Sequence, residues 1–328
     1  HERLGSGFPQ DHTLIQLVNM GSTCYINSIL QSLYNIPMIQ NYIEDVDKIT
    51  REVDISIEDT LFGLFVKIYI DSQRAPQNEV WYEPNYFLNK VFDIDTHNFH
   101  RGQMGDSYEF FLFLYRHFDI EIARINQFVN SIRNSPRMND ESYNSNNPIH
   151  RFSDFFNFDI SCKFNPAFPY YEKPEPGDTF NLIPIYPERE GVEKAILNFQ
   201  KKPYFRNFLT LPDILVIKNN ILGIDHDGKY YKNFEKTPIP FQIDLSTEKN
   251  GNNGSEKASY TLCAAVMHIS EDANGGHFMT VIRICGGLVV FDDADIWGLN
   301  TDQLVNFISR NEVPGRERTS AAYILFYQ

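Results

Sequence analysis

The spacing of apolar residues along the chain changes about 125 residues from its start. Up to that point apolar residues recur every three or four positions, and this spacing predicts helices that each bury one face. Three helices are predicted, at residues 20–37, 58–72 and 105–125. Pro37 is interpreted as the end of the first helix, and Asp106 or Ser107 as the N-terminal cap of the third.

Beyond residue 125 the pattern shifts from helices to strands. Residues 126–150 are rich in Asn and Ser and have no period, so they are interpreted as a flexible insert. Strands are predicted at 151–164, 178–187, 213–219, 239–245, 260–269, 277–285, 288–296 and 321–328, with one more helix at 300–310. Polar residues 1–13 are interpreted as a tail, and 246–259 as a second flexible loop. This order predicts an α+β fold class with a mainly antiparallel sheet.

Composition narrows the class of protein. Hydrophobic residues make up 42% of the 328-residue chain and aromatic residues 14%, which is typical of a globular protein with room for two subdomains. The net charge of −14 argues against a general nucleic-acid binder and favours a partner with a basic surface or tail. No run of 18 apolar residues spans a bilayer, so no membrane association is predicted.

The number and spacing of the cysteines indicate the cellular compartment and argue against a bound metal. The four cysteines lie far apart and form no CxxC pair, which argues against both a zinc ribbon and a disulfide framework. We therefore expect free thiols in a reducing intracellular compartment, the cytoplasm or the nucleus, and neither a metal nor another cofactor. No secretory signal is visible, but the chain begins at His1, so this observation excludes little.

Cys24 lies at the start of the first predicted helix. The positive end of the helix dipole and the nearby backbone N–H groups favour the thiolate, which is the nucleophilic form. Position alone is not decisive, because a free cysteine is more often a small buried apolar residue.

A candidate base follows two glycines. Gly275 and Gly276 precede His277 at the start of a predicted strand, where glycines weaken the strand but allow another backbone to approach closely. The alternative is an ordinary loop that ends in a structural histidine.

Two candidate carboxylates end the next strand. Side chains alternate along a strand, so Asp292 and Asp293 point to opposite faces and one of them can orient the imidazole. The alternative is a solvated strand end. A turn at 286–287 would place Asp292 about 13 Å along the strand from His277, so direct pairing requires a turn near 284–285 or a bulge.

Taken together, these segments resemble the ubiquitin-specific proteases. "NMGSTCYINSILQSLYNIP" resembles their cysteine box, and "YTLCAAVMHISEDANGGHFMTVIRICGGLVVFDDADI" with "AAYILFYQ" resembles their histidine box. "GDSYEFFLFL", "LPDILVIKN" and "IPFQIDLS" match segments between the boxes. The blocks occur in the family's order and cover most of residues 14–328.

The resemblance implies a papain-like cysteine protease with a helical thumb, an antiparallel β palm and short β fingers. It implies one catalytic domain over 14–328, with the thumb at about 14–125, the flexible insert at 126–150, and the fingers and palm at about 151–328. It also implies a deubiquitinase that hydrolyses the (iso)peptide bond after the C-terminal Gly-Gly of ubiquitin through an acyl-enzyme. The implied catalytic residues are Cys24 as nucleophile, His277 as general base, Asp292 as orienting acid, Asn19 as oxyanion donor and Asp293 as an auxiliary residue.

Further residues are implied to bind the ubiquitin tail. Asp106 and Glu109 match an acidic pair that holds arginines of that tail, and a carboxylate is chemically suited to a guanidinium. Gly275 and Gly276 would line a narrow channel for the diglycine. In the helix-cap alternative Asp106 has a purely structural role, and Glu109 then lies on a solvated helix face; both roles can coexist with tail binding.

The chain departs from the family pattern at several positions. Ser22, Gly105 and Phe278 replace the usual Asn, Gln and Tyr, and only Cys162 lies where the family has two zinc-binding CxxC pairs. Two alternatives therefore stay open: a non-catalytic ubiquitin-binding scaffold, or a protease for another ubiquitin-like modifier. An activating protein partner is also possible.

Overall fold

A computed structural model describes residues 14–75, 80–134, 148–163, 179–201, 205–248, 255–273 and 275–328. The predicted N-terminal tail and the middle of the predicted insert lie outside these residues. The chain divides into two compact units. The helical unit comprises Leu4–Asp154 and Phe291–Ile296, and the sheet unit comprises Phe155–Val290 and Trp297–Gln328.

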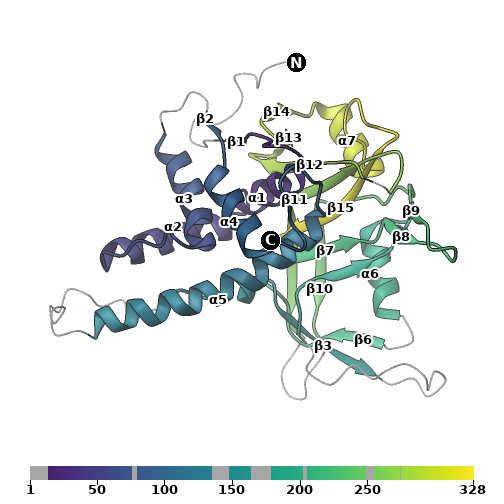
Figure 1. Ribbon diagram of the computed structural model, residues 1–328. Coiled ribbons are helices and arrows are strands. Elements are labelled where there is room, and N and C mark those ends of the chain that lie inside the picture. Colours follow the sequence, from purple (N-terminus) through teal and green to yellow (C-terminus); the bar gives the residue numbers. More distant parts are fainter. Residues whose placement is uncertain are drawn as a thin grey trace. The chain divides into compact units, whose positions relative to one another are not determined.

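The helices are α1 (Cys24–Tyr34), α2 (Pro37–Glu52), α3 (Leu61–Arg74), α4 (Asn85–Ile94), α5 (Ser107–Arg133), α6 (Val192–Lys201) and α7 (Thr301–Arg310), with a 3-10 helix at Phe152–Phe155. The strands are β1 (Ile15–Leu17), β2 (Val80–Tyr82), β3 (Phe158–Lys163), β4 (Thr179–Phe180), β5 (Ile183–Ile185), β6 (Phe205–Phe208), β7 (Leu215–Asn219), β8 (Leu222–Ile224), β9 (Tyr230–Lys232), β10 (Gln242–Ser246), β11 (Lys257–Ile269), β12 (His277–Ile284), β13 (Gly287–Asp292), β14 (Asp295–Gly298) and β15 (Ser320–Tyr327). Figure 1 labels most of them.

The helical unit is built around α1, whose residues are all buried. Aromatic rings join it to its neighbours: Tyr34 of α1 stacks on Phe65 of α3, with 4.8 Å between the centroids, and Phe65 contacts Phe118 of α5 at 5.1 Å. Such ring pairs add to the free energy gained by burying apolar surface. These rings join the C-terminal end of α1 to α3 and, through Phe65, to α5.

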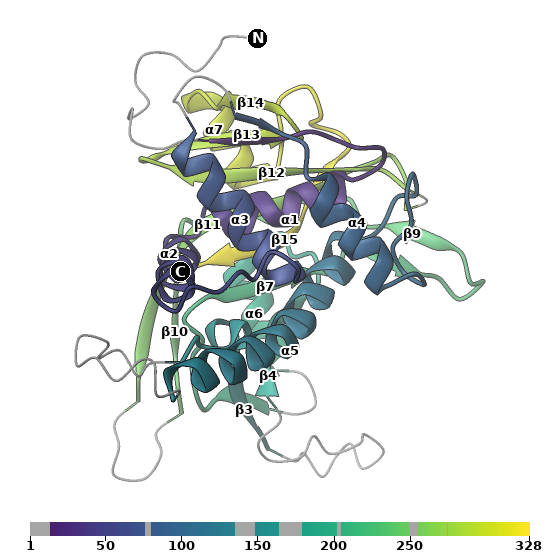
Figure 2. The same cartoon turned by 60° about the vertical axis from the view of Figure 1, so that its left-hand side comes forward.

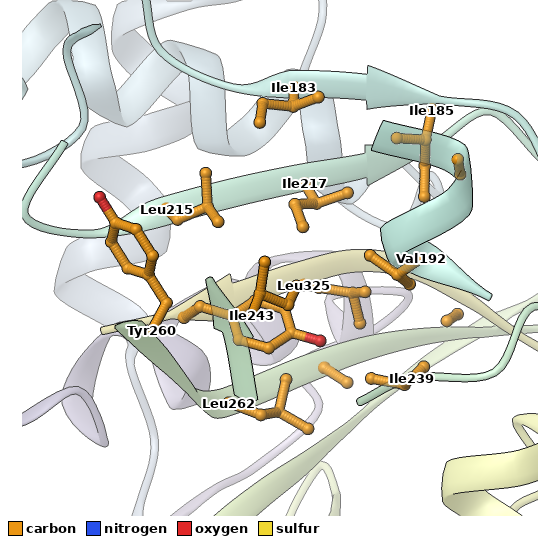
Figure 3. Close-up of a cluster of buried hydrophobic side chains, with 14 of the residues drawn as sticks. Ile183, Ile185, Val192, Leu215, Ile217, Ile239, Ile243, Tyr260, Leu262 and Leu325 are labelled. Carbon is orange, nitrogen blue, oxygen red and sulfur yellow. The ribbon is translucent and has the colours of Figure 1, made fainter. Parts of the chain in front are cut away.

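The sheet unit contains most of an eight-stranded sheet in the order β14-β13-β12-β11-β15-β7-β5, with β10 paired to β11. The pairings β10–β11, β11–β12, β11–β15 and β15–β7 are antiparallel, and β5–β7 is parallel. Figure 2 shows β10 beside β11. The core of the sheet unit combines aliphatic side chains with aromatic rings such as Tyr260, and Figure 3 shows Ile217, Leu262 and Leu325 within it. A smaller sheet has the strand order β4-β3-β6.

The fold agrees with the sequence in class and differs in detail. Pro37 does not end a helix; it is the first residue of α2, a helix that the sequence analysis missed, because proline is as well suited to N1 as to a stop. Helices α4 and α6 were also missed. The prediction of a flexible insert from residue 126 was wrong for its first eight residues, since α5 continues to Arg133 and buries Val129. No helix among the described residues is long and apolar enough to cross a membrane.

Candidate active site

Cys24 is the first residue of α1, which confirms the predicted position at a helix start, and its side chain is buried. The turn that leads into it is held by Asn19, whose side-chain Oδ1 accepts hydrogen bonds from the backbone N–H groups of Gly21 at 3.0 Å and Thr23 at 3.1 Å. Ser22 has a φ of 56°, in the left-handed region. Asn, the family's usual residue at this position, tolerates that region better than Ser does, so Ser22 carries some backbone strain.

Asp293 connects this turn to α1. Its Oδ2 accepts from Asn19 Nδ2 at 2.9 Å, and its Oδ1 accepts from Asn27 Nδ2 at 2.8 Å. Asn27 lies one helical turn after Cys24 and is 2% exposed. A single carboxylate therefore fixes the amides of two asparagines, one before the cysteine and one after it. Asn27 was not predicted from the sequence, although it lies within the segment that resembles the cysteine box.

The surroundings of Gly105 explain why this position departs from the family pattern. A Cβ atom at this position would lie 2.6 Å from the ring of Tyr25, which is closer than real atoms approach. Tyr25 is fully buried and stacks on Phe99 at 5.9 Å between centroids. Burial, and next the nearby Cys24, raise the pKa of the Tyr25 phenol, so this residue stays neutral. The ring next to the cysteine thus occupies the space that a glutamine would need.

The predicted tail-binding pair lies at the start of α5. Asp106 caps the helix, because its side chain accepts from the backbone N–H groups of Tyr108 at 2.8 Å and Glu109 at 3.1 Å. Glu109 is in the first turn and is exposed. The cap prediction for Asp106 is confirmed, and both carboxylates stand at the positive end of the helix dipole. Their role in tail binding stays a prediction.

In the sheet unit, His277 is the first residue of β12 and pairs with Ile269 of β11. Gly275 and Gly276 have φ values of 123° and 139°, a region that favours glycine. A Cβ on Gly276 would lie 2.8 Å from the carbonyl oxygen of Ile269 and 2.7 Å from Nε2 of His268. The close backbone approach predicted for the glycines is therefore present at Gly276.

The hairpin between β12 and β13 turns at Cys285–Gly286, between the two positions that the sequence analysis considered. Both turn residues have positive φ, 49° and 86°, as a two-residue type I′ turn requires. Such a turn pairs Ile284 with Gly287, and counting along the strands pairs Val281 with Val290.

Phe278 replaces the family's usual tyrosine at a buried position between two other rings. Its side chain is 2% exposed and lies 5.0 Å from the His268 ring and 5.9 Å from the Tyr323 ring, between centroids. Phenylalanine fills this buried position without a hydroxyl group that would need a hydrogen-bond partner.

Comparison with solved structures defines the class of fold. The "SAGA Ubp8/Sgf11/Sus1/Sgf73 DUB module" matches with a TM-score of 0.70 and 16% identity, over 100% of this chain and 70% of that one. The same module "bound to ubiquitin aldehyde" matches with a TM-score of 0.70 and 17% identity, over 100% of this chain and 72% of that one. The chain has the fold of these structures, and the predicted α+β class is confirmed.

The family model for ubiquitin carboxyl-terminal hydrolases matches residues 15–327. The chain belongs to this family, and the resemblance to ubiquitin-specific proteases is confirmed.

Two curated relatives give the scale of the similarity. Ubiquitin carboxyl-terminal hydrolase 7 of Caenorhabditis briggsae is 24% identical over 283 residues, 82% of this chain and 23% of that protein. Ubiquitin carboxyl-terminal hydrolase 10 of Saccharomyces cerevisiae is 29% identical over 104 residues, 30% of this chain and 13% of that protein. The chain thus matches less than a quarter of the length of these relatives.

Proposed function

We propose that this chain is a cysteine-type deubiquitinase that hydrolyses the (iso)peptide bond after the C-terminal Gly-Gly of ubiquitin. Cys24 is the nucleophile, His277 the general base and Asp292 the acid that orients the imidazole. Asn19 donates to the oxyanion, and Asp293 fixes Asn19. Membership of the family supports the reaction class.

The bridge from Asp293 to Asn19 and Asn27 carries the proposal. Asn19 Oδ1 is occupied by two backbone N–H groups, so the amide nitrogen points to the Asp293 side. An amide nitrogen has two hydrogens, and one of them is bonded to Asp293. The second remains for an oxygen that becomes negative during the reaction, and a fixed donor of this kind contributes about 3 kcal/mol to transition-state stabilisation.

The turn at Cys285–Gly286 supports the pairing of His277 with Asp292. Counting on from this turn along an unbroken antiparallel pair puts Asp292 opposite Met279. Asp292 is then offset from His277 by two residues, about 7 Å along the strand, and points to the same face. This offset is about half the separation that a turn at 286–287 would give. The side chains of His277 and Asp292 can bridge it by leaning toward each other along the strand.

The reaction follows in two steps. The Cys24 thiolate attacks the carbonyl carbon of the terminal glycine, and the oxyanion accepts a hydrogen bond from Asn19. His277 in its protonated form transfers a proton to the departing amine as the C–N bond breaks. It then removes a proton from water, which attacks the acyl-enzyme and releases ubiquitin with a free carboxylate.

Ubiquitin is the proposed partner, and the chain's net charge of −14 suits its basic tail. Asp106 and Glu109 are proposed to meet the arginines of that tail, and Gly275 and Gly276 to line the channel for the diglycine. Cys24, Cys263 and Cys285 are free cysteines, which suits a reducing cytoplasmic or nuclear compartment.

A ubiquitin C-terminal electrophile probe tests the proposal. We expect the wild-type chain to form a covalent adduct and Cys24→Ala to form none. Cys285→Ala is the matched control, because Cys285 is also a free thiol but is exposed on the hairpin turn, so its loss should leave the adduct unchanged.

The other outcomes separate the alternatives. Binding of ubiquitin without an adduct would indicate a non-catalytic scaffold and overturn the proposed activity. An adduct with a probe of another ubiquitin-like modifier, and none with ubiquitin, would assign the same chemistry to a different substrate.

A further inference from the structure

Lys232, at the end of β9, buries its ammonium group in the sheet unit. The residue is 7% exposed, and Nζ donates to the backbone carbonyls of His268 at 3.1 Å, Ser270 at 3.0 Å and Thr319 at 2.7 Å. An ammonium group has three donors, so all of them are used. Figure 1 shows β8 and β9, the hairpin that carries this lysine.

These carbonyls lie at the end of one ladder of the sheet. Strand β11 runs between β12 and β15, and its last residue, Ile269, pairs with His277 on one side and Ser320 on the other. Two of the carbonyls flank Ile269 on β11, and the third directly precedes β15. The ammonium therefore ties the end of β11 to the start of β15, at the position where β12 begins with His277.

His268 also connects the end of β11 to Gly275, the first glycine before His277. Its Nε2 lies 3.2 Å from the carbonyl oxygen of Gly275, which can only accept, so Nε2 carries the proton. Its Nδ1 is buried without a partner among the described residues. Burial, and next the charge of Lys232, lower the pKa of His268 to about 4, so the ring is neutral. Lys232 holds the backbone of His268, and the imidazole of His268 holds Gly275.

We propose that Lys232 is a positioning residue that fixes the connection from His268 to His277, and with it Gly275 and Gly276. The role assigned to those residues rests on the proposed function. Lys232 touches neither the predicted nucleophile nor the predicted base, and acts through the backbone carbonyls of His268 and Ser270.

The energetics favour a geometric role over a stabilising one. Burial, and next the charge of Lys236, lower the pKa of Lys232 to about 8, while Asp272 opposes this shift. The charged form is therefore held at a cost that its hydrogen bonds offset only in part. The ring of Phe234, 5.2 Å from Nζ, adds a favourable cation–π contact. Lys232 therefore acts by holding backbone carbonyls at the end of β11 and just before β15 in fixed positions relative to each other.

Lys236 provides a matched control. Its Nζ donates to the carbonyls of Glu317 at 3.0 Å and Ser320 at 2.8 Å, but to none in the connection that leads to His277. Lys232→Met and Lys236→Met both remove a partly or fully buried ammonium and leave carbonyls without that donor. Only the first releases His268 and Ser270.

The experiment is amide hydrogen exchange on the folded variants, combined with hydrolysis of a ubiquitin C-terminal fluorogenic substrate. In Lys232→Met we expect exchange at Ile269, Ser270 and His277 to speed up at least tenfold, with Ile217 of β7 unchanged. We expect kcat/KM to fall about tenfold. In Lys236→Met the exchange at these three amides and kcat/KM should stay within twofold of wild type.

The exchange result is independent of the proposed function. If the wild type is inactive on ubiquitin, the proposed function fails while faster exchange still supports the anchoring role. Unchanged exchange at Ile269, Ser270 and His277 in folded Lys232→Met would overturn it. If that variant does not fold, Lys232→Gln, which keeps a donor but lacks the charge and the reach, is measured instead with the same criteria.

Discussion

The amide of Asn19 is the residue-scale feature on which the proposed chemistry depends most. An asparagine side chain can rotate to exchange its oxygen and nitrogen, and each end would give the opposite effect on an oxyanion. Here two backbone N–H donors bind the oxygen and one carboxylate binds the nitrogen. The orientation is set from both ends, which is the preorganisation that transition-state stabilisation requires.

Asp293→Asn should lower kcat about tenfold, roughly 1.4 kcal/mol in transition-state stabilisation, with little change in KM. An asparagine at 293 has one acceptor oxygen, so it can accept from Asn19 or from Asn27 but presents its own N–H groups to the other. Steady-state hydrolysis of a ubiquitin C-terminal fluorogenic substrate measures this effect. Asp295→Asn, an exposed carboxylate two residues away, should behave as wild type. Equal kcat values for all three proteins would contradict the bridging role.

Residue types were easier to predict than their partners. Cys24, Asn19 and Asp293 were identified from the sequence through the resemblance. Asn27 was not, because its amide matters only through a carboxylate 266 positions away in the chain. Gly105 was interpreted only as a departure, since the ring of Tyr25 that requires it belongs to α1, far away in the sequence. Long-range contacts of this kind leave no local periodicity to detect.

At the scale of elements, the sequence predicted α1, α3, α5 and α7 close to their observed bounds, except at the C-terminal end of α5, and missed α2, α4 and α6 altogether. The missed helix α2 begins at a proline that local rules also allow as a terminator. The start of α3 depends on a residue of another helix: Glu121 of α5 accepts from the backbone N–H groups of Leu61 at 3.1 Å and Phe62 at 2.7 Å. Thr60 adds the local cap, through Gly63 N–H at 2.9 Å.

Glu121→Ala should lower the free energy of unfolding by about 3 kcal/mol, because it strips two N–H groups and His117 of a buried charged acceptor. Urea unfolding measures the change. Glu58→Gln is the control: its ion pair with Lys67 is exposed, and its loss should cost less than about 0.5 kcal/mol. A cost for Glu121→Ala no larger than that of the control would show that Thr60 alone caps α3.

Glu121 also gives the stability a pH dependence. Burial raises the pKa of its carboxyl, but the hydrogen bonds from His117 and from the N–H groups of Phe62 and Leu61 outweigh burial, and the net pKa is lowered. A lowered pKa means that the contribution is fully present above the ordinary value of 4.5 and is lost as pH falls through the folded value. Wild type should therefore lose stability more steeply than Glu121→Gln below pH 4.5, as measured by urea unfolding at a series of pH values. Parallel curves would exclude this contribution.

At the scale of the whole molecule, the excess of acidic residues has a proposed purpose in attracting the basic tail of ubiquitin. Long-range attraction of this kind weakens as salt screens it, over about 10 Å at 0.1 M ionic strength. A local contact, by contrast, belongs to one carboxylate. Glu109 is the suitable residue to separate the two effects, since it is exposed and Asp106, not Glu109, supplies the cap of α5.

Glu109→Gln, made in the inactive Cys24→Ala background, should weaken ubiquitin binding several-fold and flatten the dependence of log Kd on log salt. Glu193→Gln is the matched control, because Glu193 is likewise an exposed glutamate in the first turn of a helix, α6. Both variants lose one charge and a similar helix-dipole interaction, roughly 0.3–1 kcal/mol. If attraction by net charge alone governs binding, the two variants weaken it equally; a larger effect of Glu109→Gln places the ubiquitin tail at α5.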